Sequence, residues 1–132
     1  MSGFLKELVL ALHDLEAHFA GLSAVESHTH LDAGKADVAH AIAAVEALVA
    51  EPLIGEVRTS SGSGYSTLAL AGPGMPLSAA VSLVLPVIQR GGAATLVPFP
   101  DAPSCALALA ELCGQCGLPD GLFNVIYVDD TV

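Results

Sequence analysis

A short stretch in the first quarter of the chain contains residues whose types and spacing can bind a metal. It is His28 to Asp32 (HTHLD), in which two histidines two positions apart can place both imidazoles on one face of an extended strand. Hydrolases that use such a pair are barrels of roughly 250 residues with further ligands on later strands. This chain has 132 residues and no apolar strand before the motif. We therefore interpret HTHLD as a polar loop between two helices and predict no metal site.

The three cysteines, Cys105, Cys113 and Cys116, could act as nucleophiles or metal ligands. Cys113 and Cys116 form a CxxC, but it lies at the C-terminal end of a predicted helix, where the helix dipole disfavours a thiolate. Cys105 supplies only one further sulfur for zinc. We interpret all three as structural thiols and assign no catalytic residue. An odd number of cysteines without a recognisable secretion signal indicates a reducing compartment, so we expect a cytoplasmic protein.

Two glycine-rich turns could contact a phosphate. Gly62-Ser63-Gly64 has no strand directly before it and is typical of a linker. Gly72-Pro73-Gly74 follows a predicted strand and precedes a predicted helix, which is where doubly wound folds bind their ligands. It lacks the full GxGxxG pattern. A tight turn without a ligand and a dinucleotide contact both remain open for this second turn.

The elements that position these residues alternate along the second half of the chain. Short apolar runs at 66–72 (STLALAG), 93–98 (AATLVP) and 122–128 (LFNVIYV) predict strands. Helical patterns at 76–90 and 103–117 separate them, and Pro86 should end or bend the first of these helices. The fold class is therefore α/β: a three-stranded parallel half-Rossmann sheet (βαβαβ), which we expect to carry helices on both faces.

The first half of the chain is predicted to be helical. Apolar residues at helical spacing indicate two helices, 4–20 and 36–50, joined by a polar connector at 23–34. Gly21 should stop the first helix, and Asp37 should lie in the first turn of the second. We therefore divide the chain into a helical segment (1–58), a linker loop (59–65) and the βαβαβ unit (66–132).

Composition excludes several classes of partner. The formal net charge of -10 argues against nucleic acid and anionic membrane surfaces, because both require a basic face. The segment 59–89 contains no charged residue and is long enough to suggest a membrane span. The breakers Gly72-Pro73-Gly74 and Pro76 interrupt it, so we expect a strand and a helix there and no membrane segment.

The second half of the sequence resembles the start of the NAD-binding domain of aldehyde dehydrogenases. The shared framework includes a Pro-Leu that opens the first helix (Pro76-Leu77), a second strand that ends in Pro98, and the series GLPDGLFNV (117–125). Within the superfamily, we expect the chain to resemble the degenerate two-module branch, family 16. The resemblance implies NAD(P)-dependent oxidation of aldehydes and NAD or NADP as cofactor. It carries cofactor contacts onto Gly72, Pro73, Gly74, Val97 and Pro98.

Several family positions are substituted. The Pro-Trp-Asn of the family is Gly72-Pro73-Gly74, so the asparagine that donates to the oxyanion is missing, and the loss of one such donor costs about 2.7–4 kcal/mol. The lysine that holds the cofactor ribose is Val97, and a ribose-binding glutamate is Pro100. The family's Pro-Gly after the third strand is Tyr127-Val128. Asp129 and Asp130 then place an acidic pair beside the expected pyrophosphate, and Asp130 stands where the family has a later glycine.

These substitutions predict a pseudoenzyme module. The family's catalytic cysteine and general-base glutamate would fall beyond residue 132, so we expect a fragment or truncated product that is inactive alone and in which side chains no longer hold the cofactor. Residual nucleotide binding through backbone groups at Gly72 to Gly74 is a further hypothesis. An alternative is a non-catalytic interaction module, because half a sheet leaves a strand edge that can pair with a second copy or another aldehyde dehydrogenase module.

Overall fold

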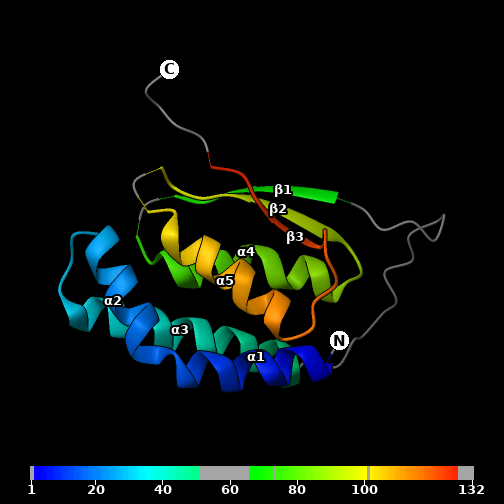
Figure 1. The fold of residues 1–132 in the computed structure, drawn as a ribbon, viewed down its shortest axis with the longest axis horizontal. Helices are drawn as coiled ribbons and strands as arrows, with labels where there is room; N and C mark the ends of the chain where they lie inside the picture. Colours follow the sequence, from blue (N-terminus) through cyan, green and yellow to red (C-terminus); the bar gives the residue numbers. More distant parts are fainter. Residues whose placement is uncertain (1, 51–65, 73, 101, 128–132) are drawn as a thin grey trace.

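The computed structural model describes residues 2–50, 66–72, 74–100 and 102–127. These residues form eight elements (Figure 1), which in chain order are α1 (Ser2–Asp14), α2 (Glu16–Glu26), α3 (Leu31–Ala50), β1 (Ser66–Leu70), α4 (Pro76–Gln89), β2 (Ala93–Val97), α5 (Ser104–Gln115) and β3 (Phe123–Val125). The predicted linker at 59–65 lies outside the described residues.

The three strands form one parallel sheet in the order β1-β2-β3. Ser66 pairs with Ala93 at the start of β1, and Leu70 pairs with Val97 at its end. On the other side of β2, Ala94 pairs with Phe123. The predicted α/β class and three-stranded parallel sheet are therefore confirmed.

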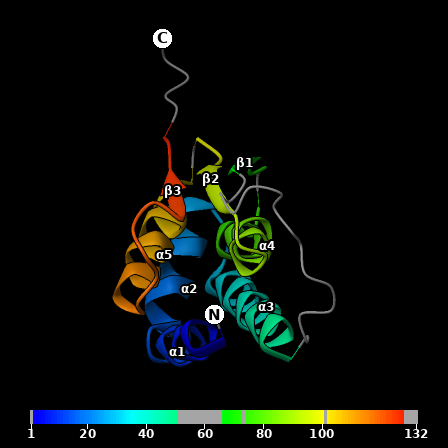
Figure 2. The same ribbon diagram turned by 90° about the vertical axis from the view of Figure 1, so that its right-hand side faces the viewer.

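Both crossover helices lie on the same face of this sheet, so the expectation of helices on both faces is wrong. Figures 1 and 2 show the sheet as one layer, α4 and α5 beneath it as a second, and α1 and α3 as a third, while α2 runs from the level of α1 up to that of α4 and α5. The physical reason is the strand order. Crossovers of one hand that step in one direction put every helix on one face. On the opposite face Leu68 and Leu70 are 65% and 71% exposed, while Ala69 points inward and is buried.

The described front of the chain, residues 2–50, contains three helices rather than the two predicted. α1 and α2 meet at Leu15 with a bend of 74°, and Gly21 lies inside α2 instead of ending a helix. The bend lets Leu12 and Phe19 both reach the core, whereas Leu15, at the bend itself, is exposed. No single described helix is long and apolar enough to cross a membrane, and α1 and α2 meet that test only as a bent pair.

One hydrophobic core joins the front helices to the βαβαβ unit. Its members come from every described element except β3, whose residues pack against it, and the largest fully buried side chains include Phe19, Leu77 and Leu109. Pro86 lies inside α4, which continues to Gln89. Leu85 and Ile88 on either side of Pro86 are buried, so packing stabilises this part of the helix despite the missing N–H.

Candidate functional site at the carboxyl edge of the sheet

The loops after β1 and β2 bring the predicted cofactor positions to one edge of the sheet. The Ala71 N–H donates to the Val97 carbonyl at 3.0 Å, directly before Gly72. Gly72 and Gly74 are exposed, Val97 is half-buried at the end of β2, and Pro98 is buried. Pro73 lies outside the described residues. The arrangement brings the two predicted groups together, and their role in cofactor binding stays a prediction.

A cavity of about 290 Å³ lies at this edge, between the end of α2 and the loops that follow β1 and β2. In Figure 1 the α2–α3 connection lies at the same end of the molecule as these two loops. The described lining residues are Ser23, Glu26, Ser27, His28, Thr29, Ala33, Gly74, Met75, Phe99 and Ala102. Of the predicted cofactor positions, Gly74 lines the cavity.

The carboxylate of Asp37, a residue of α3, lies at the N-terminus of α4. Its Oδ2 accepts from the Leu77 N–H at 3.0 Å and its Oδ1 from the Ser78 N–H at 2.8 Å, while the Ser23 hydroxyl donates to Oδ2 at 2.7 Å. The side chain is 1% exposed. Asp37 lies in the interior of α3, so its predicted place in the first turn of that helix is wrong. Met75 stands at the N-cap of α4 and makes no side-chain capping hydrogen bond. Asp37 supplies the missing acceptor from α3.

Glu26 plays the same part for α5. Its Oε1 accepts from the Ser104 N–H at 2.6 Å, and the N-cap of α5, Pro103, makes no side-chain cap. Glu26 falls in the predicted polar connector at 23–34, where no local pattern gives it a role, and it is in fact the last residue of α2. A signal was present: neither Met75 nor Pro103 can cap a helix, so both helices needed acceptors from elsewhere in the chain.

These two carboxylates determine the electrostatics of the edge. A helix N-terminus is a ready anion site because its free N–H groups and dipole favour negative charge. At α4 and α5 the chain's own Asp37 and Glu26 already meet that positive end. A phosphate would have to displace a carboxylate to bind at either helix, so the two contacts oppose the binding of an anionic ligand.

The cysteines do not contribute a nucleophile to this edge. Burial, followed by the charges of Asp37 and Glu26, raises the pKa of Cys105 to about 12. Burial and the neighbouring Cys116 raise the pKa of Cys113 to about 12, and burial also raises that of Cys116. All three are free thiols, and they stay protonated near neutral pH. Their interpretation as structural residues stays a prediction.

The HTHLD motif lies at the surface. His28, His30 and Asp32 are exposed, and the last of these is already in the first turn of α3. Among the described residues, no three His, Cys, Asp or Glu side chains gather to hold a metal ion.

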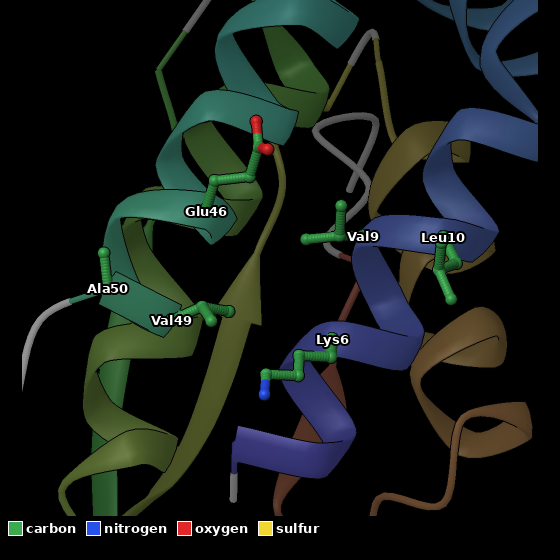
Figure 3. A pocket seen from close by; sticks show the side chains of 6 residues that line it. All are labelled: Lys6, Val9, Leu10, Glu46, Val49 and Ala50. Carbon is green, nitrogen blue, oxygen red and sulfur yellow. The ribbon is translucent and has the colours of Figure 1, made fainter.

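A second cavity, of about 390 Å³, lies between α1 and α3, away from the sheet (Figure 3). In Figure 3 the amino group of Lys6 and the carboxylate of Glu46 lie at opposite ends of the pocket, with Val9 and Val49 between them. Its described walls are mainly aliphatic, and their two charged side chains, Lys6 and Glu46, are not paired with each other. We therefore assign the candidate site to the cavity at the sheet edge. The described residues that line this second cavity are Lys6, Val9, Leu10, Glu46, Val49 and Ala50.

Known sequences similar to this chain are aldehyde dehydrogenases. It is 49% identical over 41 residues to a betaine aldehyde dehydrogenase of Mesorhizobium japonicum, which covers 31% of this chain and 8% of the relative. A betaine aldehyde dehydrogenase of Vibrio vulnificus is 41% identical over 54 residues, or 41% of this chain and 11% of the relative. The similarity therefore spans about a tenth of those enzymes. No model of a protein family matches the sequence.

Several solved structures match this fold over nearly the whole length of the present chain. The E. coli NADP dependent enzyme has a TM-score of 0.82 at 20% identity, over 98% of this chain and 30% of the other. An aldehyde dehydrogenase of Bartonella henselae gives 0.80 at 19% identity, over 97% and 29%. The P. syringae indole-3-acetaldehyde dehydrogenase, solved with NAD+, gives 0.83 at 18% identity, over 96% and 28%.

The fold is therefore α/β, of the kind seen in the matching parts of aldehyde dehydrogenases. The resemblance of this chain to the aldehyde dehydrogenase superfamily, predicted from its sequence, is confirmed by sequence and by fold. The two-module branch stays a prediction.

Proposed function

We propose that this chain is an aldehyde-dehydrogenase-like module that keeps the scaffold of the first half of an NAD(P)-binding domain. The observation that carries the proposal is the fold, which matches an NADP-dependent enzyme with a TM-score of 0.82 over 98% of this chain. Local sequence identity to betaine aldehyde dehydrogenases supports it. The family reaction, NAD(P)-dependent oxidation of an aldehyde to an acid, is then the activity of the complete enzymes to which the chain is similar. Its three free cysteines favour a cytoplasmic location.

The 132 residues alone are proposed to be inactive. Gly74 offers no side-chain donor for an oxyanion, and Val97 offers no hydrogen bond to a ribose. The thiols are held protonated by burial. Asp37 and Glu26 oppose phosphate at the two helix N-termini.

The experiment is to follow NADH absorbance when the purified chain is mixed with NAD and a series of aldehydes that includes betaine aldehyde. We expect no aldehyde-dependent NADH under conditions in which a full-length betaine aldehyde dehydrogenase gives a clear signal. A rate that scales with the concentration of this chain would refute the inactive assignment.

An interaction module is the alternative function, and the open sheet supports it. Within the described chain β1 and β3 each pair with one strand only. The uncovered face carries Leu68 and Leu70 at 65% and 71% exposure. Parallel sheets are normally covered on both faces, so a second copy or another aldehyde dehydrogenase module is the proposed partner. Size-exclusion chromatography with light scattering tests self-association. A dimer that a Leu70→Lys change dissociates would support it, and a monomer at all concentrations would exclude a second copy.

A further inference from the structure

The cavity at the carboxyl edge has the location and size of a site for a small ligand. Three separate parts of the chain form its walls: the end of α2 with the following connection, the β1–α4 loop and the β2–α5 loop. Open α/β sheets bind ligands outside the carboxyl ends of their strands. A volume of about 290 Å³ lies just below the usual range for ligand pockets, and it suits a small molecule rather than a dinucleotide.

The hydroxyl of Ser27 gives this cavity an unpaired polar group. Ser27 lines the cavity, and its Oγ is buried without a hydrogen-bond partner. Buried polar side-chain atoms nearly always have a partner in folded proteins, so an unpaired hydroxyl on a residue that lines a cavity is a group that a bound molecule can satisfy.

Backbone strain is concentrated at the same cavity. Among the described residues two that are not glycine have a positive φ, His28 at 54° and Met75 at 45°, and both line it. Met75 also precedes Pro76, a position at which extended backbone is preferred. Side chains disfavour the left-handed conformation, and residues held in it cluster at binding and catalytic sites.

Charge determines what kind of ligand the cavity accepts. Glu26 brings a carboxylate to its wall, and none of the described lining residues is Lys or Arg. The Phe99 ring and the Met75 thioether supply apolar surface. A carboxylate and an aromatic ring in the walls of one cavity favour an organic cation over an anion. The formal net charge of -10 for the whole chain acts in the same direction.

We propose that this cavity binds a small organic ammonium compound. The cationic group lies against the Glu26 carboxylate and the Phe99 ring, and a hydroxyl or N–H of the ligand pairs with the Ser27 Oγ. This binding requires neither NAD nor aldehyde oxidation, so it holds whether or not the chain has any enzymatic role.

Three probes of similar size and different charge test the proposal on the unmodified chain. Ethanolamine is the cation, ethylene glycol the neutral control and glycolate the anion. Each is titrated into the isotope-labelled chain while backbone amide signals are followed by NMR. We expect saturable shifts at Ser27, His28 and Met75 with ethanolamine, weaker ones with ethylene glycol and none with glycolate. Absence of saturable shifts there with ethanolamine, or equal binding of glycolate, would overturn the proposal.

Two variants with matched controls test the named contacts. Glu26→Gln keeps an acceptor for the Ser104 N–H but removes the charge, and Ser27→Ala removes the unpaired hydroxyl. Each should weaken ethanolamine binding by about fivefold, because a charge-assisted hydrogen bond is roughly twice as strong as a neutral one and the Ser27 contact is lost outright. The controls Glu46→Gln and Ser82→Ala, both at exposed positions, should leave the affinity unchanged. Unchanged affinity in both site variants, with the amide spectrum of the folded chain retained, would also overturn the proposal.

Discussion

Replacement of Asp37 tests the connection between the front helices and the βαβαβ unit. The carboxylate is 1% exposed and accepts hydrogen bonds from the Leu77 N–H, the Ser78 N–H and the Ser23 hydroxyl. Asp37→Ala leaves all three donors without their partner. Each buried, unsatisfied group costs about 1–3 kcal/mol. Because water can enter the space that the smaller side chain leaves, we take the lower end of that range and expect a loss of about 3–5 kcal/mol.

A loss of that size is comparable to the stability of a whole domain, about 5–15 kcal/mol, so the alanine variant can unfold. Asp37→Asn is therefore the more informative change. One oxygen still accepts a backbone N–H, while the amide group faces a second donor, and we expect a loss of about 1–3 kcal/mol. Glu46→Gln, on the exposed side of the same helix, is the control and should change stability by less than about 0.5 kcal/mol.

Urea unfolding followed by circular dichroism measures these differences. With a denaturant slope of about 1–3 kcal/mol per molar for small proteins, the asparagine variant should lower the unfolding midpoint by about 1 M. Ser23→Ala should cost less in the Asp37→Asn background than in the unmodified chain, because the two side chains share a hydrogen bond. If Asp37→Asn unfolds at the same urea concentration as Glu46→Gln, the capping of α4 by α3 contributes nothing and the reasoning is refuted.

Two further predictions concern packing and ionisation. A Cβ on Gly34 would overlap a main-chain carbonyl of α2, so Gly34→Ala should destabilise the fold by more than about 2 kcal/mol in urea unfolding. A Cβ on Gly21 would meet no atom within 4 Å, so Gly21→Ala is the control and should stabilise the fold by up to about 1 kcal/mol. A stable Gly34→Ala variant would contradict the close approach of α2 and α3. The pKa values of Cys105 and Cys113 are raised in the folded chain, so the unfolded chain loses those two protons first as the pH rises. The free energy of unfolding should therefore keep its full value below pH 9.0 and fall by about 1.4 kcal/mol per pH unit for each thiol up to about pH 12. Urea midpoints that stay flat across this interval in the unmodified chain, and that match those of a Cys105→Ala variant, would contradict it.

The order and type of the elements in the second half follow from short-range signals. Continuous apolar runs bounded by glycine and proline predict β1, β2 and β3, and helical spacing predicts α4 and α5. The covered face of the sheet could not be obtained from those runs, because a buried strand has the same apolar pattern whether one or two helical layers lie nearby. The strand order 1-2-3, a tertiary feature, sets it.

The candidate site could be predicted only in part. The positions of Gly74 and Val97 at one sheet edge follow from the βαβαβ order, since parallel strands end together. The partners of Asp37 and Glu26 are 40 and 78 positions away in the sequence, at Leu77 and Ser104. No local pattern specifies such contacts. The missing caps at the starts of α4 and α5 were the only local sign that distant acceptors were needed.

Calorimetric titration of the 132-residue chain with NAD tests most directly whether the chain keeps the fold but no longer binds the cofactor. The substitutions at Gly74 and Val97 and the carboxylates of Asp37 and Glu26 at the helix N-termini predict no saturable heat at millimolar NAD. A complete binding isotherm with one NAD bound per chain would contradict the account.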